Sequence, residues 1–292
     1  MPEEHPLAGR AAVVVGGASG VGLAVARALA AHGAGVVINS RDPDAVHLAA
    51  EFVVSDGGRA VGVAGSAADE SVAAELVAAC ERSYGGVDVL VNCAGIAEPP
   101  GSSILNVTTD QWRDLLDSHL TTVFNTCRAV APLMAARGSG SIVNTGSFAY
   151  LGDYGGTGYP AGKGAVASLS LALAAELRES GVRVNTVCPG AKTRLSTGPE
   201  YEEHIRTLHR RGLLDEVSMR GSLDAPPTEY AAALYLFLAS DAAKEVTGEI
   251  FIAAGGFVGK FERPGMTMLG YRDHASEPPW SIEELRKLTD PR

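Results

Sequence analysis

Two side chains with acid–base chemistry lie four residues apart in the segment 159–163. Tyr159 carries a phenol and Lys163 carries an ammonium group. In a helix, positions i and i+4 lie on the same face, so the two groups would point into the same space. A phenol titrates near pH ~10, and a nearby cation lowers its pKa. The pair could exchange a proton with a carbonyl or an alcohol, although a solvated helix face can show the same spacing.

Strands and helices alternate along the chain around this pair. The apolar run Ala11–Val15 is typical of a strand buried on both faces of a parallel sheet. The alternation predicts βαβ units in one doubly wound α/β domain of the Rossmann type, with a seven-stranded parallel sheet. Strands are expected at 11–15, 36–38, 60–64, 87–91, 142–145, 182–187 and 247–252. Helices are expected at 23–31, 44–55, 71–84, 110–136, 159–179 and 228–238.

A glycine-rich loop, Gly16-Gly17-Ala18-Ser19-Gly20-Val21-Gly22, joins the first strand to the first helix. This arrangement places backbone N–H groups and a helix N-terminus at an anion, and small residues let a pyrophosphate approach. The spacing is G-x-x-x-G-x-G and differs from the commoner G-x-G-x-x-G. The loop therefore predicts a bound dinucleotide.

The end of the second strand bears on which dinucleotide binds. In such folds a carboxylate at this position binds the ribose 2′-hydroxyl, whereas an arginine accommodates a 2′-phosphate. Here the position is Ser40, followed by Arg41, and the first carboxylate is Asp42. We therefore favour NADP(H), with NAD(H) as the alternative. A solvated loop arginine would explain Arg41 equally simply.

Composition narrows the class of protein further. The 292 residues are 46% hydrophobic, enough for a sizeable core, and the net charge of −10 argues against nucleic acid and anionic membranes as partners. No apolar run reaches the ~18 residues that span a bilayer, and the N-terminus lacks a secretory signal pattern. The four cysteines form no CxxC motif, which favours reduced thiols in a cytoplasmic protein and no metal site.

With these residues in place, the chain resembles the short-chain dehydrogenase/reductase family over residues 7–257. The glycine motif, an Asn-x-Ala-Gly motif at 92–95, the Ser-Tyr-Lys set and Pro189-Gly190 appear in the family's order. The resemblance implies that Tyr159 exchanges the substrate proton and Ser147 hydrogen-bonds the substrate oxygen. It also implies that Lys163 holds the nicotinamide ribose and lowers the pKa of Tyr159. The cofactor would supply the hydride. The implied cofactor contacts are Gly16, Ala18, Ser19, Gly20, Val21, Gly22, Ser40, Arg41, Ser66, Asn92, Ala94, Gly95, Tyr159, Lys163, Pro189, Gly190 and Thr193.

The chain departs from the family pattern at several positions. His119 stands where the family's fourth catalytic residue is usually Asn, which puts the proton-relay water in doubt and leaves a catalytic role for His119 open. Cys93 replaces the second Asn of Asn-Asn-Ala-Gly and is interpreted as a packed residue. Ser66 replaces the usual acidic residue. With a histidine at position 119, the chain resembles the (3R)-hydroxyacyl-thioester dehydrogenase branch of the family. That branch usually has an acidic residue at the position of Ser40.

These observations leave three functions open. The first is an NADP(H)-dependent ketone reductase or alcohol dehydrogenase, with a 3-oxoacyl thioester or polyketide intermediate as one candidate substrate. The second is an NAD-dependent 3-hydroxyacyl-thioester dehydrogenase. The third is a non-catalytic NADP(H)-binding regulator, for which the Ser-Tyr-Lys set would have no use.

The last third of the chain is expected to cover the substrate and to make intermolecular contacts. Residues 191–220 resemble the family's lid, and their basic cluster could meet an anionic substrate or could be a solvated helix face. Residues 258–292 form a tail in which Ser281 and Glu284 have capping-box spacing and Trp280 could staple onto Leu285. The tail is expected to pack on its own domain or on a neighbouring subunit. The family resemblance implies a homotetramer or homodimer paired through the two long helices.

Overall fold

The computed structural model describes residues 5–154, 156–263 and 265–289. They divide into two compact units, one ending at Phe261 and one beginning at Glu262. Each unit is treated separately below.

The first unit is built on one sheet in the order β3-β2-β1-β4-β5-β6-β7-β8. The strands from β1 to β7 are all parallel, as predicted, and β8 is antiparallel to β7. The chain order reverses between β1 and β4, and in open α/β sheets ligands bind at this point, beyond the carboxyl ends of the strands. The strands are β1 Ala11–Val15, β2 Gly35–Ser40, β3 Arg59–Ala64, β4 Val89–Asn92, β5 Gly140–Thr145, β6 Val182–Gly190, β7 Ile250–Ala254 and β8 Phe257–Phe261.

The eighth strand corrects the prediction of a seven-stranded sheet. Gly255 takes a positive φ of 56° and lets the chain turn back after β7. Phe257 then pairs with Ala254, and Phe261 pairs with Ile250. Residues from 258 onward were expected to belong to the tail, but the first four of them complete the sheet edge. The sequence Gly255-Gly256 marks this turn in retrospect.

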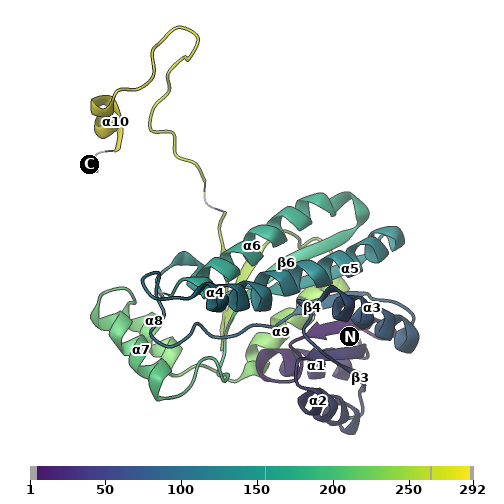
Figure 1. Cartoon of the computed structure of the whole chain (residues 1–292). Coiled ribbons are helices and arrows are strands. Elements are labelled where there is room, and N and C mark those ends of the chain that lie inside the picture. Colours follow the sequence, from purple (N-terminus) through teal and green to yellow (C-terminus); the bar gives the residue numbers. More distant parts are fainter. Residues whose placement is uncertain (1–4, 155, 264, 290–292) are drawn as a thin grey trace. The chain divides into compact units, whose positions relative to one another are not determined.

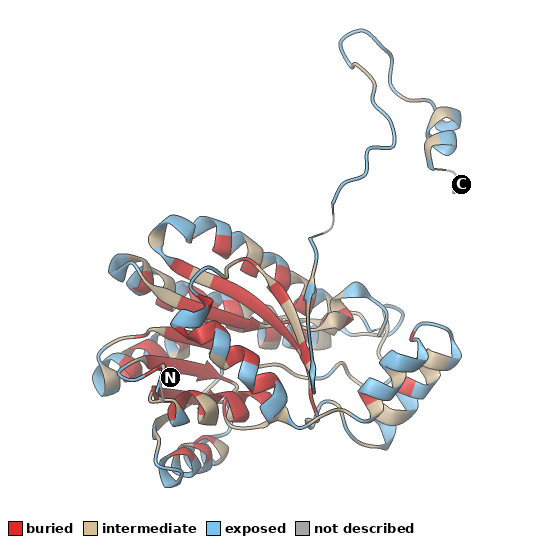
Figure 2. Cartoon of the chain, turned by 180° about the vertical axis from the view of Figure 1, so that it is seen from behind, coloured by how far each residue is buried: buried red, intermediate tan, exposed pale blue. Residues whose placement is uncertain are grey.

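Helices cover both faces of the sheet (Figure 1). The apolar sides of α1, α2 and α9 pack on one face, and those of α3, α5 and α6 pack on the other. Every residue of β1 and β4 is buried, so the middle of the sheet forms the core (Figure 2). The fold is therefore the predicted doubly wound Rossmann type. These helices are α1 Gly20–Ala31, α2 Pro43–Ser55, α3 Glu70–Tyr84, α5 Thr122–Arg137, α6 Gly158–Glu176 and α9 Thr228–Ala239.

The long helix expected at 110–136 contains one wide turn. It begins as α4, Thr109–Leu116, passes through a π-helical turn at Asp117–Thr121, and continues as α5. Such turns insert an extra residue and often occur at functional sites. His119 lies in the middle of this turn and is fully buried.

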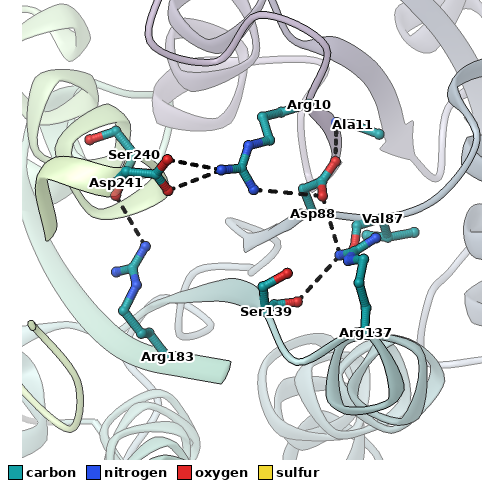
Figure 3. Close-up of polar contacts among 9 residues, drawn as sticks. All are labelled: Arg10, Ala11, Val87, Asp88, Arg137, Ser139, Arg183, Ser240 and Asp241. Atoms are coloured by element: carbon teal, nitrogen blue, oxygen red, sulfur yellow. Dashed lines mark hydrogen bonds and ion pairs between the residues drawn. The ribbon is translucent and has the colours of Figure 1, made fainter. Parts of the chain in front are cut away.

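Charged side chains cluster at the amino ends of the central strands (Figure 3). Asp88 accepts a hydrogen bond of 2.7 Å from the backbone N–H of Ala11 and pairs with Arg137 at 3.3 Å. Arg10 lies 3.8 Å from Asp88 and 2.9 Å from Asp241. Arg183 donates to the carbonyl of Ser240 at 3.2 Å. We call Arg10, Asp88, Arg137, Arg183 and Asp241 the basal charge cluster.

The second unit contains the helix α10, Ile282–Thr289. The predicted capping box is confirmed, because Glu284 accepts from the N–H of Ser281 at 2.8 Å and Ser281 accepts from the N–H of Glu284 at 3.3 Å. The Arg272 guanidinium lies 4.0 Å from the centre of the Trp280 ring and 2.7 Å from Glu284. Trp280 is thus covered by an arginine within its own unit.

Candidate active site

Ser147, Tyr159 and Lys163 come together at the carboxyl edge of the sheet. Ser147 follows β5, and Tyr159 and Lys163 lie in the first turns of α6. The Ser147 hydroxyl lies close enough to the Tyr159 phenol to lower its pKa. Lys163 is only 4% exposed, its Nζ lies 5.9 Å from the centre of the Tyr159 ring, and it donates to the carbonyl of Thr145 at 2.9 Å. A hydroxyl, a phenol and an amine therefore share one small region.

Burial dominates the electrostatics of this group. It raises the pKa of Tyr159 above its usual value, although the nearby Ser147 hydroxyl acts in the opposite direction. It lowers the pKa of Lys163 to about 8. The family resemblance implied that Lys163 lowers the pKa of Tyr159, but the net shift is upward. The lysine directs its ammonium group at the Thr145 carbonyl. Tyr159 is accordingly a protonated donor near neutral pH.

His119 packs against the same tyrosine. The two rings meet edge to face, with centroids 5.0 Å apart. The His119 Nε2 lies 3.0 Å from the carbonyl oxygen of Ile96 and must donate, because that oxygen can only accept. The Nδ1 atom then carries a lone pair, and it has no partner within the described residues. Burial and the nearby Lys163 lower the His119 pKa to about 2, so the imidazole is neutral.

The glycine loop forms a close-packed cradle. A Cβ on Gly16 would lie 2.6 Å from the backbone nitrogen of Ala94, and one on Gly22 would overlap the carbonyl oxygen of Gly16. Gly20 is the first residue of α1 and has a positive φ of 55°. A Cβ on Gly20 would lie 3.4 Å from the Thr193 side chain. The residue before it, Ser19, makes no side-chain bond to the helix N-terminus. The first-turn N–H groups of α1 thus remain available to an anion, and the cradle fits a dinucleotide pyrophosphate.

The adenine end of this site is open and polar. Arg41 is exposed, and no ion pair holds it within the described ranges of the chain. Asp42 is turned away into α2, where its carboxylate accepts from the N–H groups of Asp44 and Ala45. Ser66 lies exposed in the loop that follows β3. The nearest carboxylate is therefore used as a helix cap.

The Asn92 side chain is buried between the sheet and α5. It is 1% exposed, donates to Asn144 at 2.9 Å and accepts from Thr126 at 2.9 Å. Its role in this structure is to join β4 to β5 and α5. Cys93 beside it is a free thiol, and burial raises its pKa to about 11, in line with a packed residue.

The remaining predicted contacts lie after β4, in the glycine loop and at the end of β6. Ala94 and Gly95 follow β4, and a Cβ on Gly95 would lie 2.7 Å from the His119 ring and 3.6 Å from the Lys163 Nζ. Ala18 and Val21 lie in the glycine loop and the first turn of α1. Pro189 and Gly190 end β6, next to β7.

The expected lid is a pair of helices, α7 Pro199–Arg210 and α8 Glu216–Leu223. Two of its arginines are already paired: Arg206 lies 2.9 Å from Glu202, and Arg210 contacts Glu203 at 2.6 Å. This arrangement favours the solvated helix face over a site for an anionic substrate. Tyr201 of α7 lies close enough to Tyr159 to raise its pKa.

Two polar contacts of the site escaped the sequence analysis. Glu98 accepts from the backbone N–H of Tyr159 at 2.6 Å. Arg194 donates to the Ser19 side chain at 3.0 Å and so links the start of the lid to the glycine loop. Each contact joins positions far apart in the chain, and no local pattern marks either residue.

The doubly wound sheet, the glycine cradle and the Ser-Tyr-Lys group define an NAD(P)-dependent oxidoreductase. Comparison with known proteins gives the family, because the model of the short chain dehydrogenases matches residues 10–199. The chain belongs to the short-chain dehydrogenase/reductase family.

Three similar proteins illustrate the match. A cis-4-hydroxycyclohexanecarboxylate dehydrogenase of Sinomonas cyclohexanicum is 38% identical, over 85% of this chain and 96% of its own. A 3-oxoacyl acyl-carrier-protein reductase of Chlamydia muridarum is 33% identical, over 86% and 98%. The crystal structure of a short chain dehydrogenase from Mycobacterium avium has a TM-score of 0.78 at 31% identity and covers 97% of this chain and 94% of its own.

No group of three or more metal-ligating side chains occurs in residues 5–154, 156–263 and 265–289. No helix in those ranges is both long and apolar enough to span a bilayer.

Proposed function

We propose that this protein transfers a hydride between NADP(H) and a ketone or secondary alcohol. The observation that carries the proposal is the convergence of Ser147, Tyr159 and Lys163 beside Gly95 at the carboxyl edge of the sheet. A second group of observations supports the cofactor, namely the glycine cradle and the open N-terminus of α1.

In the proposed reduction, the Tyr159 and Ser147 hydroxyls donate hydrogen bonds to the carbonyl oxygen of the substrate. The bound cofactor supplies the hydride to the carbonyl carbon. The Tyr159 proton moves to the oxygen as the C–H bond forms, and in the oxidation the phenolate takes it back. The raised pKa of Tyr159 keeps its phenol protonated at neutral pH. The protonated phenol is the form that reduction requires. Lys163 would hold the nicotinamide ribose hydroxyls.

His119 does not act as an acid or a base in this proposal. An imidazole whose pKa is about 2 does not take up a second proton at physiological pH. Its donated hydrogen bond fixes the Ile96 carbonyl, and its ring supports the Tyr159 ring from the side. His119 is therefore a positioning residue where the family usually has Asn.

The preference for NADP(H) rests on the end of β2. Arg41 is exposed and unpaired within the described part of the chain, and Asp42 is committed to capping α2. An arginine free to meet a 2′-phosphate, with no carboxylate facing the ribose, supports NADP(H) over NAD(H). Arg41→Ala should therefore weaken NADPH binding and leave NADH binding unchanged. Equal losses for both cofactors would refute this part of the proposal.

The substrate class rests on the lid and on the relatives. One similar protein is named for a ring secondary alcohol and another for a 3-oxoacyl thioester. In this chain the lid arginines Arg206 and Arg210 are paired with glutamates, which reduces the positive charge available to a carrier phosphate. We therefore place compact ketones and secondary alcohols ahead of 3-oxoacyl thioesters and polyketides. An NAD-dependent 3-hydroxyacyl-thioester dehydrogenase is the second candidate, favoured by the histidine at position 119.

The direct experiment is a panel of cyclic ketones, open-chain ketones and 3-oxoacyl thioesters. Each is assayed with NADPH and with NADH by the loss of reduced-cofactor absorbance. We expect turnover with NADPH, greatest on compact ketones. Cofactor binding without turnover on any carbonyl would favour a non-catalytic regulator.

Assembly and location complete the proposal. Phe124 and Leu133 on α5 are exposed, at 48% and 38%, which supports pairing of the long helices in a homodimer or homotetramer. The tail exposes Met266 and Tyr271, at 88% and 77%, which supports its packing on this domain or on a neighbouring subunit. Four free cysteines support the cytoplasm. Light scattering of the full chain and of a chain ending at Phe261 would test the assembly.

A further inference from the structure

The helix that carries Tyr159 and Lys163 lacks a capping side chain of its own. Thr157 occupies the N-cap position of α6 and makes no side-chain hydrogen bond to the helix. The N–H groups in the first turn of a helix have no partner within that helix. In α6 these groups include the N–H of Tyr159, so a group from another part of the chain must satisfy it.

Glu98 provides that group from 61 positions earlier in the chain. Its Oε2 accepts from the N–H of Tyr159 at 2.6 Å, and its Oε1 accepts from the N–H of Gly158 at 3.3 Å. Ser102 donates to the same carboxylate at 2.9 Å. A carboxylate at this end also complements the helix dipole. Glu98 thus holds the backbone of the proposed proton donor.

The segment around Glu98 is itself fixed on both sides. Two residues earlier, the carbonyl of Ile96 accepts the hydrogen bond from His119. On the other side Gly156 takes a positive φ of 80°, and a Cβ there would lie 3.1 Å from the Glu98 carboxyl group. The loop after β4 and the start of α6 are therefore fitted closely to each other.

We propose that Glu98 is a positioning residue for Tyr159, setting the phenol against Ser147 and the substrate oxygen by capping α6. The inference rests on the proposed function, since it takes Tyr159 as the proton donor. A donor displaced by a fraction of an ångström transfers its proton more slowly. The glycine-rich loop and the N-terminus of α1, which would hold the pyrophosphate, lie on other elements, so cofactor binding should change much less than turnover.

Glu98→Ala and Glu98→Gln test this role, with Thr108→Ala as the matched control. Thr108 lies in the same loop and caps a different helix, α4, by accepting from the N–H of Gln111 at 3.2 Å. In Glu98→Ala we expect hydrogen exchange at the Gly158 and Tyr159 amides to speed up about tenfold. We expect kcat to fall about tenfold or more, with a much smaller change in the Kd for NADPH.

The solvent deuterium isotope effect on kcat separates positioning from a loss of folded protein. It should rise in Glu98→Ala, because proton transfer becomes slower relative to the other steps, and it should stay at the wild-type value in Thr108→Ala. Glu98→Gln keeps one acceptor oxygen and should fall between the two. It also carries the comparison if Glu98→Ala does not fold.

Three results would overturn these claims, each at a different point. Unchanged amide exchange in the Glu98 variants refutes the cap, and this measurement needs no substrate. Faster exchange with wild-type kcat and isotope effect refutes the positioning role. Absence of turnover in the wild-type protein overturns the proposed function and with it the role of Glu98. Turnover that does not change in the Glu98 variants overturns this inference alone.

Discussion

The two ends of the central strands treat charged groups in opposite ways. At the amino ends, the basal charge cluster sets Arg10 and Arg137 against Asp88, and the arginines remain more than a third exposed. At the carboxyl ends, Lys163 is buried with a carbonyl oxygen as its partner. The imidazole of His119 keeps an unpaired nitrogen within the described part of the chain.

The amino ends of the strands thus carry charges that stabilise the fold, and the carboxyl ends carry the side chains of the proposed chemistry. Within the basal charge cluster, Asp88 pairs with Arg10 and Arg137 and accepts from the N–H of Ala11, so these residues can hold β1, β4 and α5 together. Burying an ammonium group without a carboxylate costs folding free energy. The proposed active site bears that cost at Lys163, where burial lowers the pKa to about 8. Residues at the two ends should therefore respond in opposite senses to mutation.

The largest effect is expected for Lys163→Met, which keeps the length of the side chain and removes its charge. Turnover should fall by on the order of 10²-fold, because Lys163 would no longer hold the nicotinamide ribose in place. The free energy of unfolding at pH 7 should rise by on the order of 1 kcal/mol, because a buried charge is removed. Urea unfolding and steady-state kinetics check the two halves. A Lys163→Met variant that is both active and less stable than the wild-type protein would contradict this difference between the two ends of the strands.

The same variant gives a pH test with a defined sign. The pKa of Lys163 is about 8 in the folded protein, against 10.5 for an unperturbed lysine such as that of the unfolded chain. Between these values the unfolded chain binds more protons, so wild-type stability should gain a positive contribution from Lys163 as pH rises through this window. The stability advantage of Lys163→Met should accordingly shrink from pH 8 to pH 10.5.

Asp88→Ala should produce the opposite pattern at the other end of the strands. It leaves the buried N–H of Ala11 without its acceptor and removes the partner of Arg10 and Arg137. We expect a loss of about 2 kcal/mol in stability, most of it from the unsatisfied N–H. The kcat per folded molecule should stay at the wild-type value. A selective loss of kcat would show that the two ends are coupled.

His119→Asn should have the smallest effect and sharpens the comparison at the active-site end. The His119 pKa is about 2 in the folded protein, against 6.5 for an unperturbed histidine such as that of the unfolded chain. As pH falls through this window, the unfolded chain takes up a proton that the folded chain refuses, so stability decreases. The variant should lose stability less steeply between pH 6.5 and pH 4, with turnover reduced by less than about tenfold. An equally steep acid loss would contradict a buried neutral imidazole.

Features set by local sequence could be predicted well. The spacing of Tyr159 and Lys163 fixes their shared helix face, and the apolar runs fix the parallel strands. The position of Ser147 after a strand placed it near Tyr159, since the carboxyl ends of parallel strands share one edge. The substitution of histidine for asparagine at position 119 could also be read from the chain directly.

Features set by contacts between distant residues could not be predicted. Glu98 lies in a loop without a repeating pattern, and only the folded chain brings it to the start of α6. The π-helical turn at His119 breaks a helix whose apolar spacing looked continuous. Asn92 matched a motif, but its buried bonds to Asn144 and Thr126 depend on three elements meeting. A motif therefore fixed the place of a residue without fixing the direction of its side chain.

The most direct test of the central claim is ketone-dependent NADPH oxidation by Tyr159→Phe beside the wild-type protein, with the NADPH Kd measured in parallel. The substitution removes one hydroxyl and keeps the ring that packs against His119. We predict turnover reduced by ~10²–10⁴-fold with an unchanged Kd. Turnover near the wild-type rate in this variant would contradict the assignment of Tyr159 as the proton donor.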